Sequence, residues 1–145
     1  MLVKEAMSRD VKTVGPDEQI QEAARIMLDM DVGALPVGED DRLVGMITDR
    51  DIAIRAVAEG KPPTTKVGDV MSHEVLYCFD DQDLEDIAQN MAEMKIRRMP
   101  VVNRDKRLVG IIALADLVTS AKSGYATAAL SGISQAGGAH SQSAR

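Results

Sequence analysis

Two short groups of polar residues in this chain have the types and spacing for ligand chemistry. The first is Thr48 and Asp51, a hydroxyl and a carboxylate three residues apart, directly after an apolar run that ends at Ile47. A carboxylate can accept two charge-assisted hydrogen bonds from neighbouring sugar hydroxyls, while Thr48 and free amides at a helix start favour a phosphate. The second is Arg97-Arg98, whose planar guanidinium groups suit phosphate oxygens. These residue types together predict a site for a small phosphorylated sugar.

Each group also fits a purely structural role. Thr48-x-x-Asp51 is close to a capping box, in which a hydroxyl and an acid close the first turn of a helix. A cap and a ligand contact can coexist, so both interpretations stay open. Arg97 and Arg98 can be a solvated strand edge, and adjacent strand residues point to opposite faces. We therefore expect only one of the two to reach a given ligand.

The chain offers few groups for other chemistry. His73 and His140 have no companion Cys or acid at metal-ligand spacing, so no metal site is expected. Cys78 is the single cysteine and sits in an apolar run, which predicts a buried strand residue. Neither a Ser-His-Asp nor a Cys-His set is evident. We therefore expect a protein that is not an enzyme and has no cofactor.

The elements that position these residues follow from an internal repeat. A shift of 64 residues aligns Met7-Ser8 with Met71-Ser72 and Pro36-Val37 with Pro100-Val101. After one inserted residue, Arg42-Leu43-Val44-Gly45 aligns with Arg107-Leu108-Val109-Gly110. The sequence therefore predicts a first repeat over 1–60, a linker over 61–66, a second repeat over 67–122 and a flexible Ser/Gly/Ala-rich tail over 123–145.

Each repeat has the same pattern, β-α-β-β-α, which places the chain in the α+β class. Short strands are expected at 11–14 and 75–78, each followed by a helix with Asp17 or Asp81 as N-cap. The two helices carry apolar residues at three-to-four spacing. Two strands, at 34–37 and 43–47, follow around a charged hairpin loop, and a second helix runs from about 49 to 58. The faces expected to be apolar are Ile20, Ala23, Ala24, Met27 and Met30 in the first repeat, and Leu84, Ile87, Ala88, Met91 and Met94 in the second.

Charge and hydropathy restrict the partners. The net charge of −6 argues against general binding to nucleic acid. A local cluster of six basic residues against Asp105 suits a small anion better; it consists of Lys95, Arg97, Arg98, Arg104, Lys106 and Arg107. The longest apolar run, 108–115, is much shorter than the roughly 20 residues of a membrane span. We expect a cytoplasmic protein that binds neither nucleic acid nor membrane.

The repeat and its motifs resemble the CBS domain pair. The motifs that carry the resemblance are V-G-A-L-P-V at 32–37, R-L-V-G-M-I-T-D-R-D at 42–51, K-I-R-R-M-P-V-V at 95–102 and R-L-V-G-I-I-A-L-A-D at 107–116. The resemblance covers residues 1 to about 122 and is to short stand-alone bacterial members. It implies a pseudo-two-fold pair of repeats, with sheets packed together, helices outside and two clefts between the repeats. In many members these clefts bind AMP, ADP, ATP or S-adenosylmethionine.

The resemblance also assigns roles to residues. The pattern Gly-h-x-Thr/Ser-x-x-Asp matches residues 45–51 in full, which gives Asp51 to the ribose hydroxyls, and the basic residues before the proline of the other repeat match Arg97 and Arg98. The adenine would lie against an apolar wall made of Met46, Val75, Leu76 and Ile96.

The two implied clefts are unequal. In the second repeat Ala113 replaces the threonine, although Asp116 remains, and the positions that match the two arginines are Gly33 and Ala34. We therefore expect one competent site and one weak or silent site. The resemblance implies a sensor that binds an adenine nucleotide, forms a homodimer and signals to a separate, unidentified protein. The alternative is a ligand-free structural dimer that mediates protein–protein interaction.

Overall fold

The computed structural model describes residues 1–113, and they fold into two compact units. Of the described residues, 12–75 form the first-repeat unit, and 1–11 together with 76–113 form the second-repeat unit. Asp116, His140 and the tail over 123–145 lie outside the described residues. Each unit is a mixed α+β fold with its own hydrophobic core.

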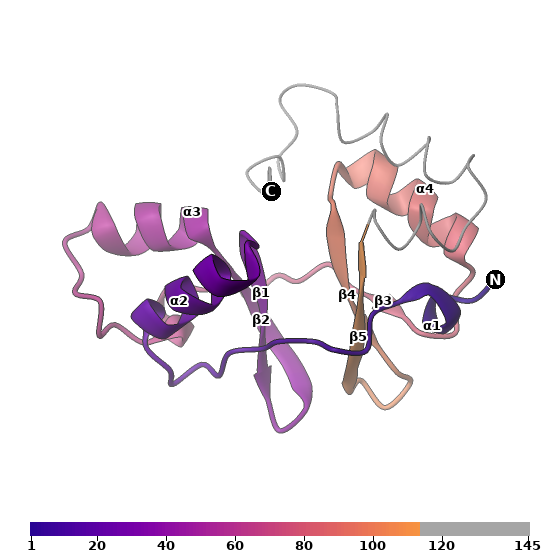
Figure 1. The fold of residues 1–145 in the computed structure, drawn as a ribbon, viewed down its shortest axis with the longest axis horizontal. Coiled ribbons are helices and arrows are strands. Elements are labelled where there is room, and N and C mark those ends of the chain that lie inside the picture. Colours follow the sequence, from indigo (N-terminus) through magenta and orange to yellow (C-terminus); the bar gives the residue numbers. More distant parts are fainter. Residues whose placement is uncertain (114–145) are drawn as a thin grey trace. The chain divides into compact units, whose positions relative to one another are not determined.

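The first-repeat unit is built on an antiparallel hairpin. Strand β1 (Ala34–Glu39) pairs with β2 (Arg42–Thr48), and the turn between them is the pair Asp40-Asp41, with φ values of 54° and 64°. Two central residues with positive φ are typical of a type I′ turn. Helix α2 (Ile20–Met30) and the helix that begins with α3 (Asp49–Asp51) lie on the same side of this hairpin (Figure 1). The unit is completed by a π-helix, η1 (Ile52–Val57), and a 3-10 helix, η2 (Val67–Asp69).

The second-repeat unit contains a three-stranded sheet in the order β3-β4-β5. Strand β3 (Cys78–Phe79) is parallel to β4 (Arg98–Val102), and β4 is antiparallel to β5 (Leu108–Ala113). Helix α4 (Leu84–Met94) packs on this sheet, and the short helix α1 (Val3–Ala6) comes from the start of the chain (Figure 1). Cys78 lies in β3 with 2% of its surface exposed, which confirms that it is a buried strand residue.

The compact units differ from the sequence repeats because two lead-in segments are exchanged. Residues 1–11 begin the first repeat but belong to the second-repeat unit, and residues 67–75 begin the second repeat but belong to the first-repeat unit. Val3 and Met7 pack in the core of the second-repeat unit, whereas Val67 and Met71 pack in the core of the first-repeat unit. Gly45 makes this packing possible, because a Cβ there would lie 2.7 Å from Met71 Sδ and 2.8 Å from the Ser72 carbonyl oxygen. Two bonds between Met46 and Ser72 fasten the segment to β2, with N···O distances of 3.0 and 2.8 Å. In each unit, therefore, the Met-Ser motif contacts the glycine of the Leu-Val-Gly motif: Met71-Ser72 contacts Gly45, and Met7-Ser8 contacts Gly110.

The strand expected at 11–14 is reduced to a single bridge at Val14, and the one expected at 75–78 begins only at Cys78. The proline in the neighbouring strand explains both results. Val14 donates to Pro36 O at 3.2 Å and accepts from Gly38 N at 3.0 Å. The next bond of this parallel ladder requires an N–H at residue 36, which proline lacks. Pro100 occupies the same register position beside Cys78.

The predicted helix caps were wrong by two residues. Helix α2 has Gln19 as its N-cap with no side-chain bond, and α4 has Asp83, whose Oδ1 accepts from Glu85 N at 2.9 Å. Asp81 instead pairs with Arg104. The predicted apolar faces are largely confirmed: Ile20, Ala23, Met27, Leu84, Ile87, Ala88 and Met91 are buried, whereas Ala24, Met30 and Met94 are exposed and Ile26 is an additional buried residue.

No helix within residues 1–113 is long and apolar enough to span a lipid bilayer.

Candidate functional site

Thr48 and Asp51 lie at the junction between β2 and α3 and form a reciprocal capping box. Thr48 Oγ1 accepts from Asp51 N at 3.0 Å, and Thr48 N donates to Asp51 Oδ2 at 3.0 Å. The second helix of the first repeat therefore begins at Asp49, as predicted. The side chain of Asp51 is 16% exposed. The cap fixes the carboxylate at the end of the strand and leaves oxygen lone pairs for other donors, because an ionised carboxylate accepts at about four positions.

The expectation of free amides at this helix start was wrong. Asp49 N donates to Gly33 O at 2.9 Å, Arg50 N donates to Asp49 Oδ1 at 2.8 Å, and Asp51 N donates to Thr48 Oγ1. The capping side chains thus satisfy the amides that a phosphate would use. At this helix start, therefore, these three amides are already occupied, and we look to cationic side chains for phosphate recognition.

Arg97 lies in the connection between α4 and β4, and Arg98 is the first residue of β4. The helix ends at Lys95, which has a left-handed backbone with φ of 57°, and the chain then enters the strand at Arg98. Both arginines are half-buried. Ile96, expected in the adenine wall, is 7% exposed and packs in the core of the second-repeat unit.

The other expected wall residues are divided between the two units. Met46 lies on β2 and is half-buried, and it pairs with Ser72. Val75 is in the first-repeat unit, and Leu76 is in the second-repeat unit; both are half-buried.

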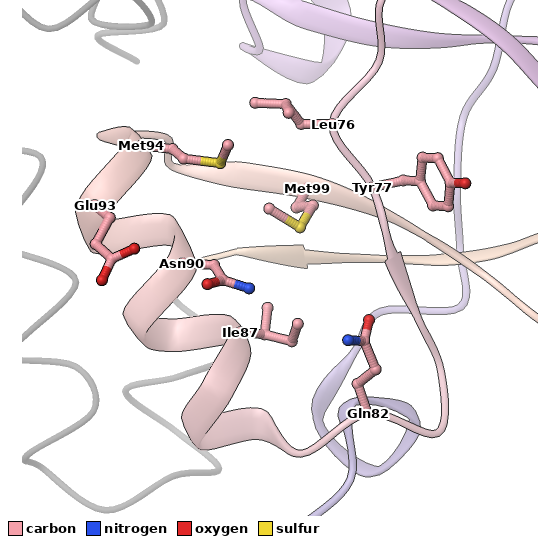
Figure 2. A pocket seen from close by; sticks show the side chains of 8 residues that line it. All are labelled: Leu76, Tyr77, Gln82, Ile87, Asn90, Glu93, Met94 and Met99. Atoms are coloured by element: carbon pink, nitrogen blue, oxygen red, sulfur yellow. The ribbon is translucent and has the colours of Figure 1, made fainter.

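Leu76 lines a cavity of about 270 Å³ within the second-repeat unit (Figure 2). The cavity lies between α4 and the segment that enters β3, and Met94 and Met99 border it. Of the site residues expected from the sequence, Leu76 alone is among its described lining residues, which also include Tyr77, Gln82, Ile87, Asn90 and Glu93. The cavity thus shares one residue, Leu76, with the expected nucleotide site.

The expected site thus has one half in each unit. Met46, Thr48, Asp51 and Val75 belong to the first-repeat unit, whereas Leu76, Ile96, Arg97 and Arg98 belong to the second-repeat unit. The structure brings Thr48 and Asp51 together directly through two hydrogen bonds.

Gly33 and Ala34, assigned to the weak second site, lie at the start of β1. A Cβ at Gly33 would lie 3.2 Å from Asp49 Oδ2, so the glycine allows the Asp49 carboxylate to approach. The residues that match Gly33 and Ala34 in the other repeat are Arg97 and Arg98. Asp116, the third residue of that site, lies outside the described residues.

Arg55 is a neighbour of the site that the sequence reasoning missed. It lies on η1 one turn after Asp51, with 3.8 Å between Arg55 Nε and Asp51 Oδ1. Arg55 Nη1 also donates to the carbonyl oxygens of Met71 at 3.3 Å and Val70 at 3.5 Å. The sequence did contain one signal for this pair, because Arg55 follows the helix-start acid Asp51 by four residues, a spacing typical of helical ion pairs. Its partners Val70 and Met71 could not be predicted from the sequence, because they lie on a lead-in segment whose exchange the sequence does not reveal.

The ionisable groups with shifted pKa values lie elsewhere. The bidentate hydrogen bonds from Arg104 lower the pKa of Asp81, and the Arg104 guanidinium also lies 4.1 Å from the centre of the Phe79 ring. Burial, with a smaller contribution from Asp80, raises the pKa of Cys78 to about 12. Within residues 1–113 no group of three or more His, Cys, Asp or Glu side chains has the geometry to hold a metal ion.

The fold and both repeats match known proteins. The CBS domain family model matches residues 3–57 and 67–123, and the chain therefore belongs to the CBS domain family. The CBS domain-containing protein YhcV of Bacillus subtilis is 47% identical over 133 residues, which cover 91% of this chain and 94% of YhcV.

Solved structures agree with this assignment. A crystal structure of Hypoxic Response Protein I with two coordinated zinc ions has a TM-score of 0.74 and 36% identity, and the match covers 84% of this chain and all of that one. A crystal structure of CBSX2 in complex with AMP has a TM-score of 0.72 and 29% identity, over 82% of this chain and 94% of that one. A crystal structure of the CBS domain pair of protein MJ0100 in complex with 5-methylthioadenosine and S-adenosyl-L-methionine has a TM-score of 0.68 and 31% identity, over 82% of this chain and 94% of that one.

Proposed function

We propose that this CBS pair is a regulatory module that binds an adenine nucleotide and signals to a separate protein without catalysing a reaction. The observation that carries the proposal is the half-buried Asp51 carboxylate, which the Thr48 cap holds at the end of β2. Its remaining lone pairs suit the two hydroxyls of a ribose. The AMP found in the similar CBSX2 structure supports this ligand class.

In this proposal the phosphate is bound by the other repeat. Asp51 and the phosphate cannot share one cluster of groups, since the helix-start amides are occupied and the carboxylate repels an anion. Arg97 and Arg98 supply the opposite charge from the second-repeat unit, and Met46, Val75 and Leu76 supply apolar contact to the base. A ligand shifts the equilibrium between conformations of the chain by no more than its difference in affinity for them.

Calorimetric titration with AMP, ADP, ATP, NAD and S-adenosylmethionine tests the proposal. We expect heat from at least one of these ligands, and none at millimolar concentration from any of them would refute it. Asp51→Asn keeps an oxygen for the Thr48 amide but removes the charge, and we expect about tenfold to a hundredfold weaker binding. Asp116→Asn is the matched control and should leave the affinity unchanged; equal losses would contradict a single competent site.

The second proposal is that the chain acts as a homodimer. Four large apolar side chains are exposed on the two long helical segments of the first-repeat unit: Leu28 at 77%, Val57 at 68%, Ile54 at 51% and Met30 at 47%. Large apolar side chains exposed on a small protein favour a protein contact where they gather into one surface. Sedimentation velocity at micromolar concentration should give the mass of a dimer, and a monomer would contradict this proposal.

A further inference from the structure

Arg55 contacts the candidate ribose carboxylate on one side and the exchanged lead-in segment on the other. Its Nε lies 3.8 Å from Asp51 Oδ1, and its Nη1 bonds to Met71 O and Val70 O at 3.3 and 3.5 Å. The arginine side chain is 54% exposed, whereas that of Asp51 is 16% exposed. The guanidinium thus extends from the surface over a carboxylate that has little contact with solvent.

The two oxygens of Asp51 are consequently oriented by different groups. Oδ2 accepts the Thr48 amide within the capping box. Oδ1 faces Arg55, which is itself fixed by two backbone carbonyls. A planar guanidinium with several donors can bind carbonyls and a carboxylate at the same time. Those carbonyls are fixed in turn, because the next residue, Ser72, pairs with Met46 on β2.

We propose that Arg55 is a positioning residue of the nucleotide site, which orients Asp51 toward the ribose hydroxyls. This inference rests on the proposed function. Asp51 is the last residue of α3, and Arg55 lies on the π-helix η1 that follows it, with the bond Ala58 N to Ala53 O at 2.9 Å. Single π-turns occur frequently at functional sites.

The second repeat lacks this arrangement in its sequence. With the one-residue insertion, the position equivalent to Arg55 is Ser120. A serine carries no charge and is too short to connect a carboxylate to a distant carbonyl. The first repeat alone therefore has the full set of Thr48, Asp51 and Arg55.

The test measures affinity and ribose selectivity in the full chain. We expect Arg55→Ala to weaken AMP binding by about tenfold, the loss of one charge-assisted interaction, and Arg55→Lys to restore part of it. Arg25→Ala on α2 removes the same charge from an exposed position of the same unit, and it should leave the affinity unchanged. The discrimination between AMP and 2′-deoxy-AMP should decrease in Arg55→Ala, because the oriented carboxylate is what detects the 2′-hydroxyl.

A double-mutant cycle separates positioning from general stabilisation. In the Asp51→Asn background, Arg55→Ala should cause no further loss of affinity. If Arg55→Ala lowers unfolding stability but leaves both AMP affinity and ribose discrimination unchanged, the positioning role is wrong while the nucleotide function stands. If the unmodified chain binds none of the nucleotides, the proposed function fails and this inference fails with it.

Discussion

Replacing Gly45 by alanine should disrupt the contact that joins the exchanged segment to the first-repeat unit. The new Cβ would lie 2.7 Å from Met71 Sδ and 2.8 Å from Ser72 O. The sulfur is at the end of a flexible side chain and can move. The carbonyl oxygen is backbone and already accepts a hydrogen bond from Met46 N at 3.0 Å, so the segment itself must shift.

The magnitude follows from these two contacts. Overpacking of a close-packed site costs about 1–3 kcal/mol, and one weakened backbone hydrogen bond adds about 1 kcal/mol. We therefore expect Gly45→Ala to lower the free energy of unfolding by about 2–4 kcal/mol. Gly110→Ala should behave alike, because a Cβ there would lie 2.8 Å from Ser8 O.

The assay is equilibrium unfolding in urea followed by circular dichroism. Gly15→Ala is the matched control, because a Cβ at Gly15 would meet its nearest atom, Glu18 Cγ, at 3.8 Å. That variant should be neutral or stabilised by up to about 1 kcal/mol, since alanine restricts the unfolded chain. If the free energies of unfolding of Gly45→Ala and Gly15→Ala differ by less than about 0.5 kcal/mol, the exchanged segment does not approach Gly45 as closely as described.

Two further predictions concern the buried thiol and the exposed apolar residues. Because burial raises the pKa of Cys78 from 9.0 to about 12, iodoacetamide at pH 8 should alkylate it about a thousandfold more slowly in the folded than in the urea-unfolded chain. The stability that the buried neutral thiol contributes is complete below pH 9 and is lost as the pH rises toward 12. Cys78→Ala should remove this pH dependence of the free energy of unfolding. Val57→Glu should shift the sedimentation coefficient from dimer to monomer, whereas Tyr77→Glu, with 40% exposure outside a helix, should not; a dimer that survives Val57→Glu would place the interface elsewhere.

The sequence predicted the two hairpin strands of the first repeat and most of the helix faces because each depends on local pattern, whereas the strands expected at 11–14 and 75–78 were reduced by the proline in the neighbouring strand. It did not predict the exchange of the lead-in segments. Met7-Ser8 and Met71-Ser72 are identical, and so are the Leu-Val-Gly segments that receive them, so the pattern fits packing within a repeat as well as between repeats. Only the path of the chain between the units decides between these possibilities.

The candidate site was predictable to a similar extent. The capping box at Thr48 and Asp51 is local and was recognised as one of two roles. The occupied amide of Arg50 depends on the rotamer of Asp49, which spacing does not reveal. Arg55 was missed because its partners are 15 and 16 residues away, on the exchanged segment.

The central claim is that the Asp51 carboxylate binds the ribose of an adenine nucleotide. The most direct measurement is a calorimetric titration of AMP into the unmodified chain and into Asp51→Asn, at the same protein concentration. We predict saturable binding by the unmodified chain and an affinity at least about tenfold weaker for the variant. Equal affinity for AMP in both proteins would contradict the claim.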